Sequence, residues 1–191
     1  MYIYFIHSST TSLLSRSIGI YTKNKYNHVS IGFDQELTEV YSFGRKQIHN
    51  PLVGGFVKED MGSGLFTTAN CQIYRMAVTQ AEYYQMKTML QAFEERRHEL
   101  KYNFLGLIFL SWGFEMDRPN HYFCSEFAAT VLQEATAIVL PKKVSFMTPQ
   151  DMTSLSEMEF IYEGALSSYL ELNELAKFGY PMTWDATTIA Y

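Results

Sequence analysis

The stretch HYFCSEFAATVL, residues 121–132, joins an aromatic run to the start of a helical pattern, and Cys124 lies at the junction. If a helix begins near Cys124, residues at offsets of three, four, seven and eight share its face. These residues are Phe127, Ala128, Val131 and Leu132. The pattern predicts a helix that packs on a core, carries the thiol at its N-terminus and continues until Pro141.

The position of Cys124 has two interpretations. Unpaired N–H groups and the dipole at a helix N-terminus favour the thiolate, which is the nucleophilic form of cysteine. A free cysteine also serves often as a small buried hydrophobic residue. The only other cysteine is Cys71, and no secretory context calls for a disulfide, so we expect two reduced thiols.

A nucleophilic thiol needs a base, and the chain contains five histidines. They are His7, His28, His49, His98 and His121. His98 lies in the charged EERRHE run and His49 in a glycine-rich stretch, so neither is favoured. His7 and His121 stay open. His28 opens a predicted strand, where its ring would project at the sheet margin and meet the end of a packed helix, so it is the strongest candidate for the base.

Two short runs predict a β-hairpin around His28. They are HVSIGFD, residues 28–34, and LTEVYSFG, residues 37–44, separated by a polar turn. A register with Phe33 opposite Thr38 would put Glu39 and Tyr41 on the face of His28. Either side chain would then fix the tautomer of the imidazole. A register shifted by one residue would bring Ser42 to that face instead.

The remaining segments predict an alternation of strands and helices. We expect further strands over residues 2–7, 71–78 and 159–166, and helices over residues 10–23, 79–99, 104–114 and from Thr148. Thr79 precedes Glu82 by three residues, which is the spacing of a capping box. The apolar run 104–114 is shorter than the ~20 residues of a membrane span and predicts a buried helix. Glycines and prolines in residues 45–64 predict a long surface loop.

Composition narrows the class of protein. A chain of 191 residues, 47% of them hydrophobic, fits one domain, with a core over residues 1–166 and a C-terminal extension over residues 167–191. A net charge of −5 without a basic run argues against a nucleic-acid or anionic-membrane partner. The N-terminus lacks a basic region and a cleavage site, which predicts a cytoplasmic protein. No CxxC or HxxxH spacing is present, so we expect no metal and no other cofactor.

Several of these segments together resemble a known family. YNHVSIGFD, LTEVYSFGRK, KYNFLGL, YFCSEFAATVL and TPQDM occur in this order over residues 1–166. The chain thereby resembles the circularly permuted papain-like cysteine hydrolases of the NlpC type, in particular the YiiX-like bacterial group. In permuted members the histidine precedes the cysteine, here by 96 positions. The resemblance implies an α+β fold in which a central antiparallel sheet packs against helices, including the helix of the nucleophile.

The resemblance also assigns roles to residues. It makes Cys124 the nucleophile and His28 the base. The family's third polar residue falls nearest Tyr41, with Glu39 as the alternative, although many relatives carry histidine, glutamate or asparagine there. Tyr102 matches a tyrosine that shapes the oxyanion site, where the N–H of Cys124 would be the other donor.

Three functions follow as alternatives. The first is a cysteine hydrolase acting on a small-molecule, peptide or lipid substrate, since the superfamily cleaves amides and, in relatives of lecithin:retinol acyltransferase, transfers acyl groups. The second is a binding or regulatory module that kept the fold without efficient chemistry. The third, metal binding through HYFC, has the least support. The sequence predicts no stable membrane insertion and gives no oligomeric state.

Overall fold

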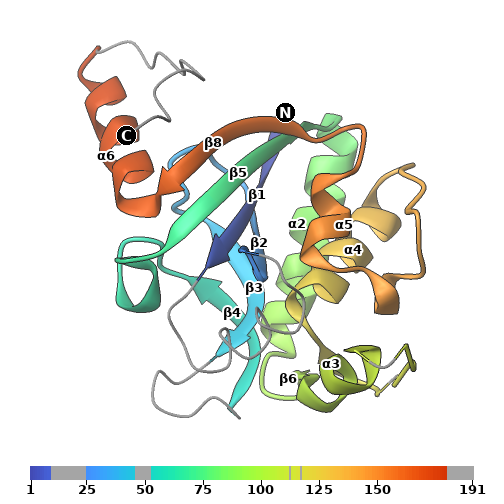
Figure 1. Ribbon diagram of the computed structural model, residues 1–191. Coiled ribbons are helices and arrows are strands. Elements are labelled where there is room, and N and C mark those ends of the chain that lie inside the picture. The colour runs from blue at the N-terminus through green and yellow to red at the C-terminus, as the bar shows by residue number, and fades with distance from the viewer. Residues whose placement is uncertain (10–24, 46–52, 112, 117, 180–191) are drawn as a thin grey trace.

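A central antiparallel sheet organises the molecule. The computed structural model describes residues 1–9, 25–45, 53–111, 113–116 and 118–179 (Figure 1). Within these residues the sheet has six strands in the order β4-β3-β2-β1-β5-β8. The strands are β1 (Tyr2–Ser9), β2 (His28–Gly32), β3 (Val40–Arg45), β4 (Gly54–Glu59), β5 (Asn70–Ala77) and β8 (Glu159–Ala165). A separate parallel pair joins β6 (Lys101–Tyr102) to β7 (His121–Tyr122).

Helices cover the sheet on both sides. The helices α2 (Gln80–Glu95), α4 (Cys124–Ala135) and α5 (Pro149–Thr153) lie along one face, whereas α6 (Leu166–Lys177) lies at the other (Figure 1). The helix α3 (Phe104–Ser111) follows β6. Two short 3₁₀ helices are η1 (Gly64–Phe66) and η2 (Val144–Phe146). The predicted α+β class with an antiparallel sheet against helices is therefore confirmed.

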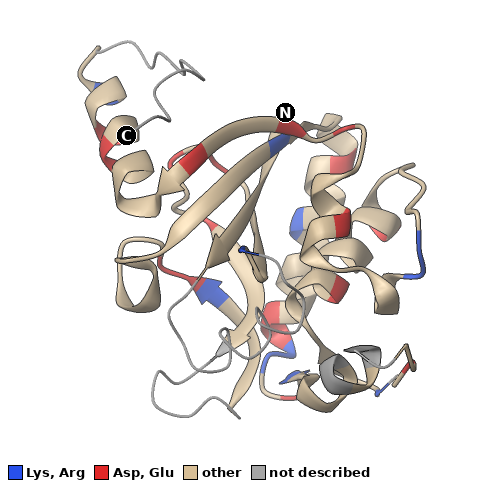
Figure 2. Cartoon of the chain, viewed as in Figure 1, with Lys and Arg blue, Asp and Glu red and all other residues tan. Residues whose placement is uncertain are grey.

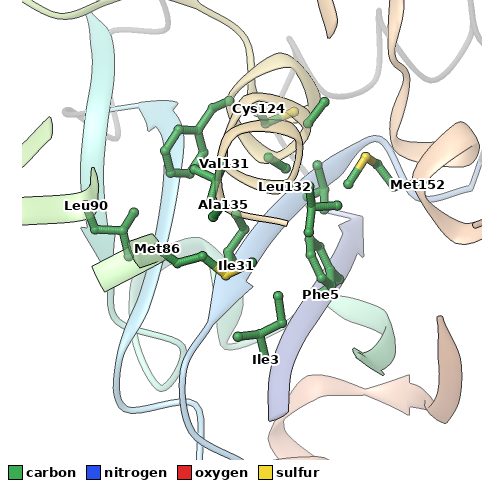
Figure 3. Packing of buried hydrophobic residues seen from close by; sticks show 14 of the residues in the cluster. Ile3, Phe5, Ile31, Met86, Leu90, Cys124, Val131, Leu132, Ala135 and Met152 are labelled. Carbon is green, nitrogen blue, oxygen red and sulfur yellow. The ribbon is translucent and has the colours of Figure 1, made fainter. Parts of the chain in front are cut away.

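The larger core lies between the sheet and α2, α4 and α5 (Figure 3). The predicted inward face of the cysteine helix is buried in it: Phe127, Ala128, Val131 and Leu132 are fully shielded from solvent. They pack on alternate strand residues that include Phe5 and Ile31. This burial supplies most of the driving force that holds α4, and hence its first residue, against the sheet.

A smaller core lies on the opposite face of the sheet. It contains Ile6 of β1, Val40 of β3 and Cys71 of β5, and it is closed by Leu166 and Tyr169 of α6. The Tyr169 hydroxyl donates to the Gln35 carbonyl at 3.0 Å, so α6 also anchors the turn between β2 and β3. The predicted extension from residue 167 is thus helical as far as Lys177.

Most of the predicted elements are confirmed. The capping box of Thr79 and Glu82 opens α2, and Thr148 caps α5 with Pro149 in its first turn. The strands predicted near residues 2–7, 71–78 and 159–166 correspond to β1, β5 and β8. The helix predicted over residues 10–23 lies outside the described residues. Lysine, arginine, aspartate and glutamate are spread over several elements (Figure 2).

Three predictions were wrong in part. The helix of Cys124 ends at Ala135 and not near Pro141, because the backbone adopts an extended conformation at Thr136. The predicted loop over residues 45–64 contains the strand β4, which pairs with β3 along its whole length. The helix α3 is not wholly buried, since Leu105 is 46% exposed.

Candidate active site

The thiol of Cys124 lies at the first residue of α4, as the sequence predicts. The N-cap residue Phe123 has no side-chain acceptor, and its own N–H donates to the buried Glu126 carboxylate at 3.3 Å. The N–H groups of the first turn are therefore left without an N-cap side chain, which is the arrangement that attracts negative charge. The Ser125 hydroxyl donates to the Met147 carbonyl at 2.7 Å and ties this turn to η2.

The imidazole of His28 lies between Cys124 and an acidic side chain. His28 is the first residue of β2, and its Nε2 lies 3.0 Å from Oε1 of Glu59 on β4. The Cys124 side chain lies beside the same imidazole and helps to raise its pKa. Two segments that are far apart in sequence thus meet at the ring of His28.

A buried polar cluster surrounds the Glu59 carboxylate. Ser30 donates to Oε2 at 2.6 Å, and Ser42 donates to Oε1. Both serines are fully buried, and the side chain of Glu59 is 6% exposed. The donors to the carboxylate in the described part of the chain all come from strands of the sheet, so the carboxylate is held by rigid backbone.

The electrostatics of this cluster favour an ion pair. Burial opposes protonation of His28, but Glu59 and the adjacent Cys124 side chain outweigh it and raise the pKa of His28 to about 10. Burial likewise opposes ionisation of Glu59, yet the His28 charge and the donors His28, Ser30 and Ser42 hold the pKa of Glu59 below its ordinary value. An imidazolium beside a carboxylate is therefore the stable state at neutral pH.

The predicted hairpin exists, but the predicted register is wrong. Ile31 lies opposite Tyr41 and Gly32 opposite Val40, one residue from the expected pairing. Side chains alternate along a strand, so this shift moves Glu39 and Tyr41 to the other face and brings Ser42 to the face of Ser30. The Asp34 carboxylate fixes this turn by accepting from the N–H groups of Thr38 and Glu39, at 2.8 and 2.7 Å.

The two predicted orienting residues are engaged elsewhere. The Tyr41 hydroxyl donates to the Glu39 carboxylate at 3.0 Å, and Lys87 of α2 forms an ion pair with that carboxylate. The Tyr41 ring stacks on Phe56, on the α2 and α4 side of the sheet. The structure therefore places Glu59, and neither Tyr41 nor Glu39, on the ring of His28.

Tyr102 lies close to the cysteine in the fold. It pairs with Tyr122 across the β6–β7 ladder, and Tyr122 is two residues before Cys124. Its Cβ lies near β4, since a side chain added at Gly54 would come within 2.8 Å of that atom. The adjacent Asn103 accepts from the Gly106 N–H at 2.9 Å and so fixes the start of α3.

Glu59 is the functional candidate that sequence reasoning missed. It lies at the end of GGFVKE, a run whose glycines favour the interpretation as a loop. The run Phe56 to Glu59 has no alternation of apolar and polar residues, and only the pairing of β3 with β4 sets Glu59 on the face of Val40. Pairing register decides this side, and the sequence does not specify it.

The other histidines described by the structure lie outside this contact. His98 is exposed, as expected, and His121 bonds the Pro119 carbonyl through Nδ1 at 2.8 Å. His49 lies outside the described residues. In the part of the chain that is described, no three His, Cys, Asp or Glu side chains are grouped so that they could hold a metal ion. Both cysteines are free thiols.

A cavity of about 710 Å³ lies away from the thiol, at the C-terminal end of α4. Its lining includes Thr136, Ile138 and Leu155, and neither Cys124 nor His28 belongs to it.

No protein-family model matches the chain, and a search of curated proteins finds no match. Among the described residues, no helix is both long enough and apolar enough to cross a membrane.

Proposed function

We propose that this protein is a cysteine hydrolase in which Cys124 is the nucleophile, His28 the base and Glu59 the residue that orients the base. One observation carries the proposal: the His28 ring contacts the Cys124 side chain and the Glu59 carboxylate at once. A nucleophile, a base and an acidic group in a chain of hydrogen bonds is the arrangement that activates thiols and hydroxyls in covalent catalysis. The order of its sequence motifs, which resembles that of circularly permuted papain-like hydrolases, supports the same proposal.

The chemistry follows from the three groups. The reacting pair is a thiolate and an imidazolium: His28 holds the proton that the Cys124 thiol gives up, and the thiolate is stabilised by the imidazolium and by the helix N-terminus. The sulfur attacks a carbonyl carbon, and N–H groups of the first turn of α4 stabilise the oxyanion. The imidazolium then protonates the leaving amine or alcohol, which leaves a thioester on Cys124. Water, deprotonated by His28, hydrolyses the thioester and restores the thiol.

The polar character of the Glu59 cluster supports catalysis over simple core filling. Burying a carboxylate, an imidazole and two hydroxyls is costly unless every group is paired. A cysteine that only filled space would need none of them. Here Ser30, Ser42 and His28 all bind the one carboxylate, so the fold keeps an ion pair beside the thiol.

A lipid acyl donor is the second candidate substrate class. The observation in its favour is the exposed apolar surface around α3, where Leu105 is 46% and Phe114 64% exposed. The helix α3 begins two residues after Tyr102, whose strand pairs with the segment that leads into Cys124. Faster acylation by p-nitrophenyl octanoate than by p-nitrophenyl acetate would support this class, and equal rates would contradict it.

The reactivity of the thiol tests the main proposal. Iodoacetamide at neutral pH should label Cys124 at least ~10-fold faster than N-acetylcysteine, because only the thiolate reacts. The buried Cys71 is the internal control and should stay unlabelled, since burial raises the pKa of its thiol to about 12. The site of labelling is read by peptide mass spectrometry.

Three variants sharpen the test. His28→Ala and Glu59→Gln should each slow the labelling of Cys124 by ~10-fold or more, because they remove the cation or its anchor. Glu39→Gln is the matched control: it removes a partly buried carboxylate that bonds a tyrosine and a lysine instead of His28. Labelling of Cys124 no faster than the model thiol, with no change in His28→Ala, would refute the assignment.

A further inference from the structure

A second imidazole, that of His7, lies beside the proposed catalytic pair and has no evident structural use. His7 is 1% exposed, and its Nε2 is buried without a hydrogen-bond partner among the described residues. The imidazole meets the Tyr74 ring edge-on, with centroids 5.5 Å apart. An unpaired buried polar atom costs about 1–3 kcal/mol, so an apolar residue at this position would favour stability.

The strand register places His7 on the same side of the sheet as Cys124. His7 lies two residues after Phe5 on β1 and directly opposite Val29 on β2. Phe5 and Val29 both belong to the core cluster that contains Cys124. Residues two apart on a strand, and residues paired across strands, share a face. Val29 also follows His28 directly, so His7 lies at the end of the sheet where the thiol and its base meet.

His7 is suited to act as an uncharged hydrogen-bond donor. Burial, reinforced by the nearby charge of His28, lowers the pKa of His7 to about 3. At neutral pH His28 therefore carries the positive charge while His7 stays an uncharged imidazole with one N–H. A neutral imidazole can donate a hydrogen bond to a developing oxyanion without competing for the proton of the thiol.

We propose that His7 is a further catalytic residue, whose Nε2–H donates to the oxyanion formed when Cys124 attacks a carbonyl. The inference rests on the proposed function and adds a side-chain donor to the N–H groups of α4. It explains why the buried Nε2 of His7 has no hydrogen-bond partner among the described residues: its partner is the substrate oxygen. No covalent bond to His7 forms, and its proton stays on the ring throughout.

Two probes separate this role from the nucleophile itself. Acylation of Cys124 by p-nitrophenyl acetate passes through an oxyanion, whereas alkylation by iodoacetamide does not. His7→Phe should slow acylation by ~10²-fold or more, in line with the loss of one oxyanion donor. It should change the alkylation rate by less than about 2-fold, because Cys124 and His28 are intact. Acylation is followed by the p-nitrophenolate burst.

Further variants keep the test decisive. His7→Gln retains an N–H donor and should recover part of the acylation rate. His7→Met, unbranched and apolar, takes the place of His7→Phe if the phenyl ring prevents folding. His121→Phe is the control, since His121 bonds a backbone carbonyl outside the contact of Cys124 with His28.

Each outcome has a separate meaning. A His7→Phe protein that alkylates and acylates like the wild type overturns the role of His7 and leaves the hydrolase proposal standing. Equal slowing of both reactions also overturns it, because His7 would then act on the thiol and not on the oxyanion. A wild-type protein that neither alkylates rapidly nor acylates overturns both proposals.

Discussion

The Nε2 of His28 lies 3.0 Å from a carboxylate oxygen of Glu59, although the two residues are 31 positions apart in sequence. The contact joins the first residue of β2 to the last residue of β4, across the intervening strand β3. It depends on the register of both strand pairs, because a shift of one residue in either would turn one of the side chains to the other face.

Ser42→Ala should destabilise the fold and weaken the ion pair. The Ser42 hydroxyl is fully buried and donates to Glu59, so its loss removes one of the hydrogen bonds that hold a buried carboxylate. We expect a loss of about 1–3 kcal/mol in the free energy of unfolding, measured by urea denaturation. Ser154→Ala removes an exposed hydroxyl that bonds the Gln150 carbonyl and should cost less than about 0.5 kcal/mol. Equal losses in the two variants would contradict the role of Ser42.

Tyr41→Phe should leave the reactivity of Cys124 within about 2-fold of the wild type. Its hydroxyl donates to Glu39, on the opposite side of the sheet from the Glu59 cluster, so its removal does not touch the base. Iodoacetamide labelling measures the rate. A large decrease would show that Tyr41 acts on His28 after all.

Stability should fall as the pH rises from about 6.5 to about 10. The pKa of His28 is near 6.5 in the unfolded chain and about 10 in the folded one, so the folded state binds the extra proton over this range. The contribution is complete below pH 6.5 and is lost as the pH passes 10, with a slope of about 1.4 kcal/mol per pH unit. Glu59→Gln should flatten this slope in urea titrations, and Glu39→Gln should not.

Because of His7, the free energy of unfolding should show the opposite pH dependence in acid. The pKa of His7 is lowered to about 3, so between pH 6.5 and 3 the unfolded state binds more protons than the folded state. Stability is therefore present above pH 6.5 and declines as the pH falls. The wild type should lose about 1.4 kcal/mol per pH unit more than His7→Phe over this range. Parallel curves for the two proteins would show that His7 does not stay neutral.

Gly54→Ala should perturb the contact between β4 and Tyr102. An added Cβ would lie 2.8 Å from both the Gly44 carbonyl oxygen and the Tyr102 Cβ, so backbone has to move. Overpacking of this kind costs about 1–3 kcal/mol. Gly62→Ala is the matched control, because its nearest neighbour is the Asp60 carboxylate at 3.5 Å. Thermal melting that is unchanged in both variants would contradict the close approach.

Local patterns predicted much of the fold and two of the three residues of the candidate site, Cys124 and His28. The periodicity after Cys124 and the capping boxes of Thr79 and Thr148 act through neighbouring residues, which the sequence displays directly. Glu59 could not be found in this way, because its place beside His28 depends on two strand registers. The β2–β3 register is set by the turn at Asp34, where Leu37 takes a positive φ of 56°. Such a backbone conformation is uncommon for leucine and has no signal in the hydrophobic pattern.

The arrangement of β2, β3 and β4 as neighbours has a consequence for the order of folding. These strands follow one another in sequence and pair locally, so His28 and Glu59 can meet early. The thiol is 65 positions further along the chain than Glu59 and reaches them only when α4 docks. An incompletely folded chain can thus pair His28 with Glu59 before Cys124 reaches the imidazole. Docking of α4 is the step that completes the contact of the three side chains.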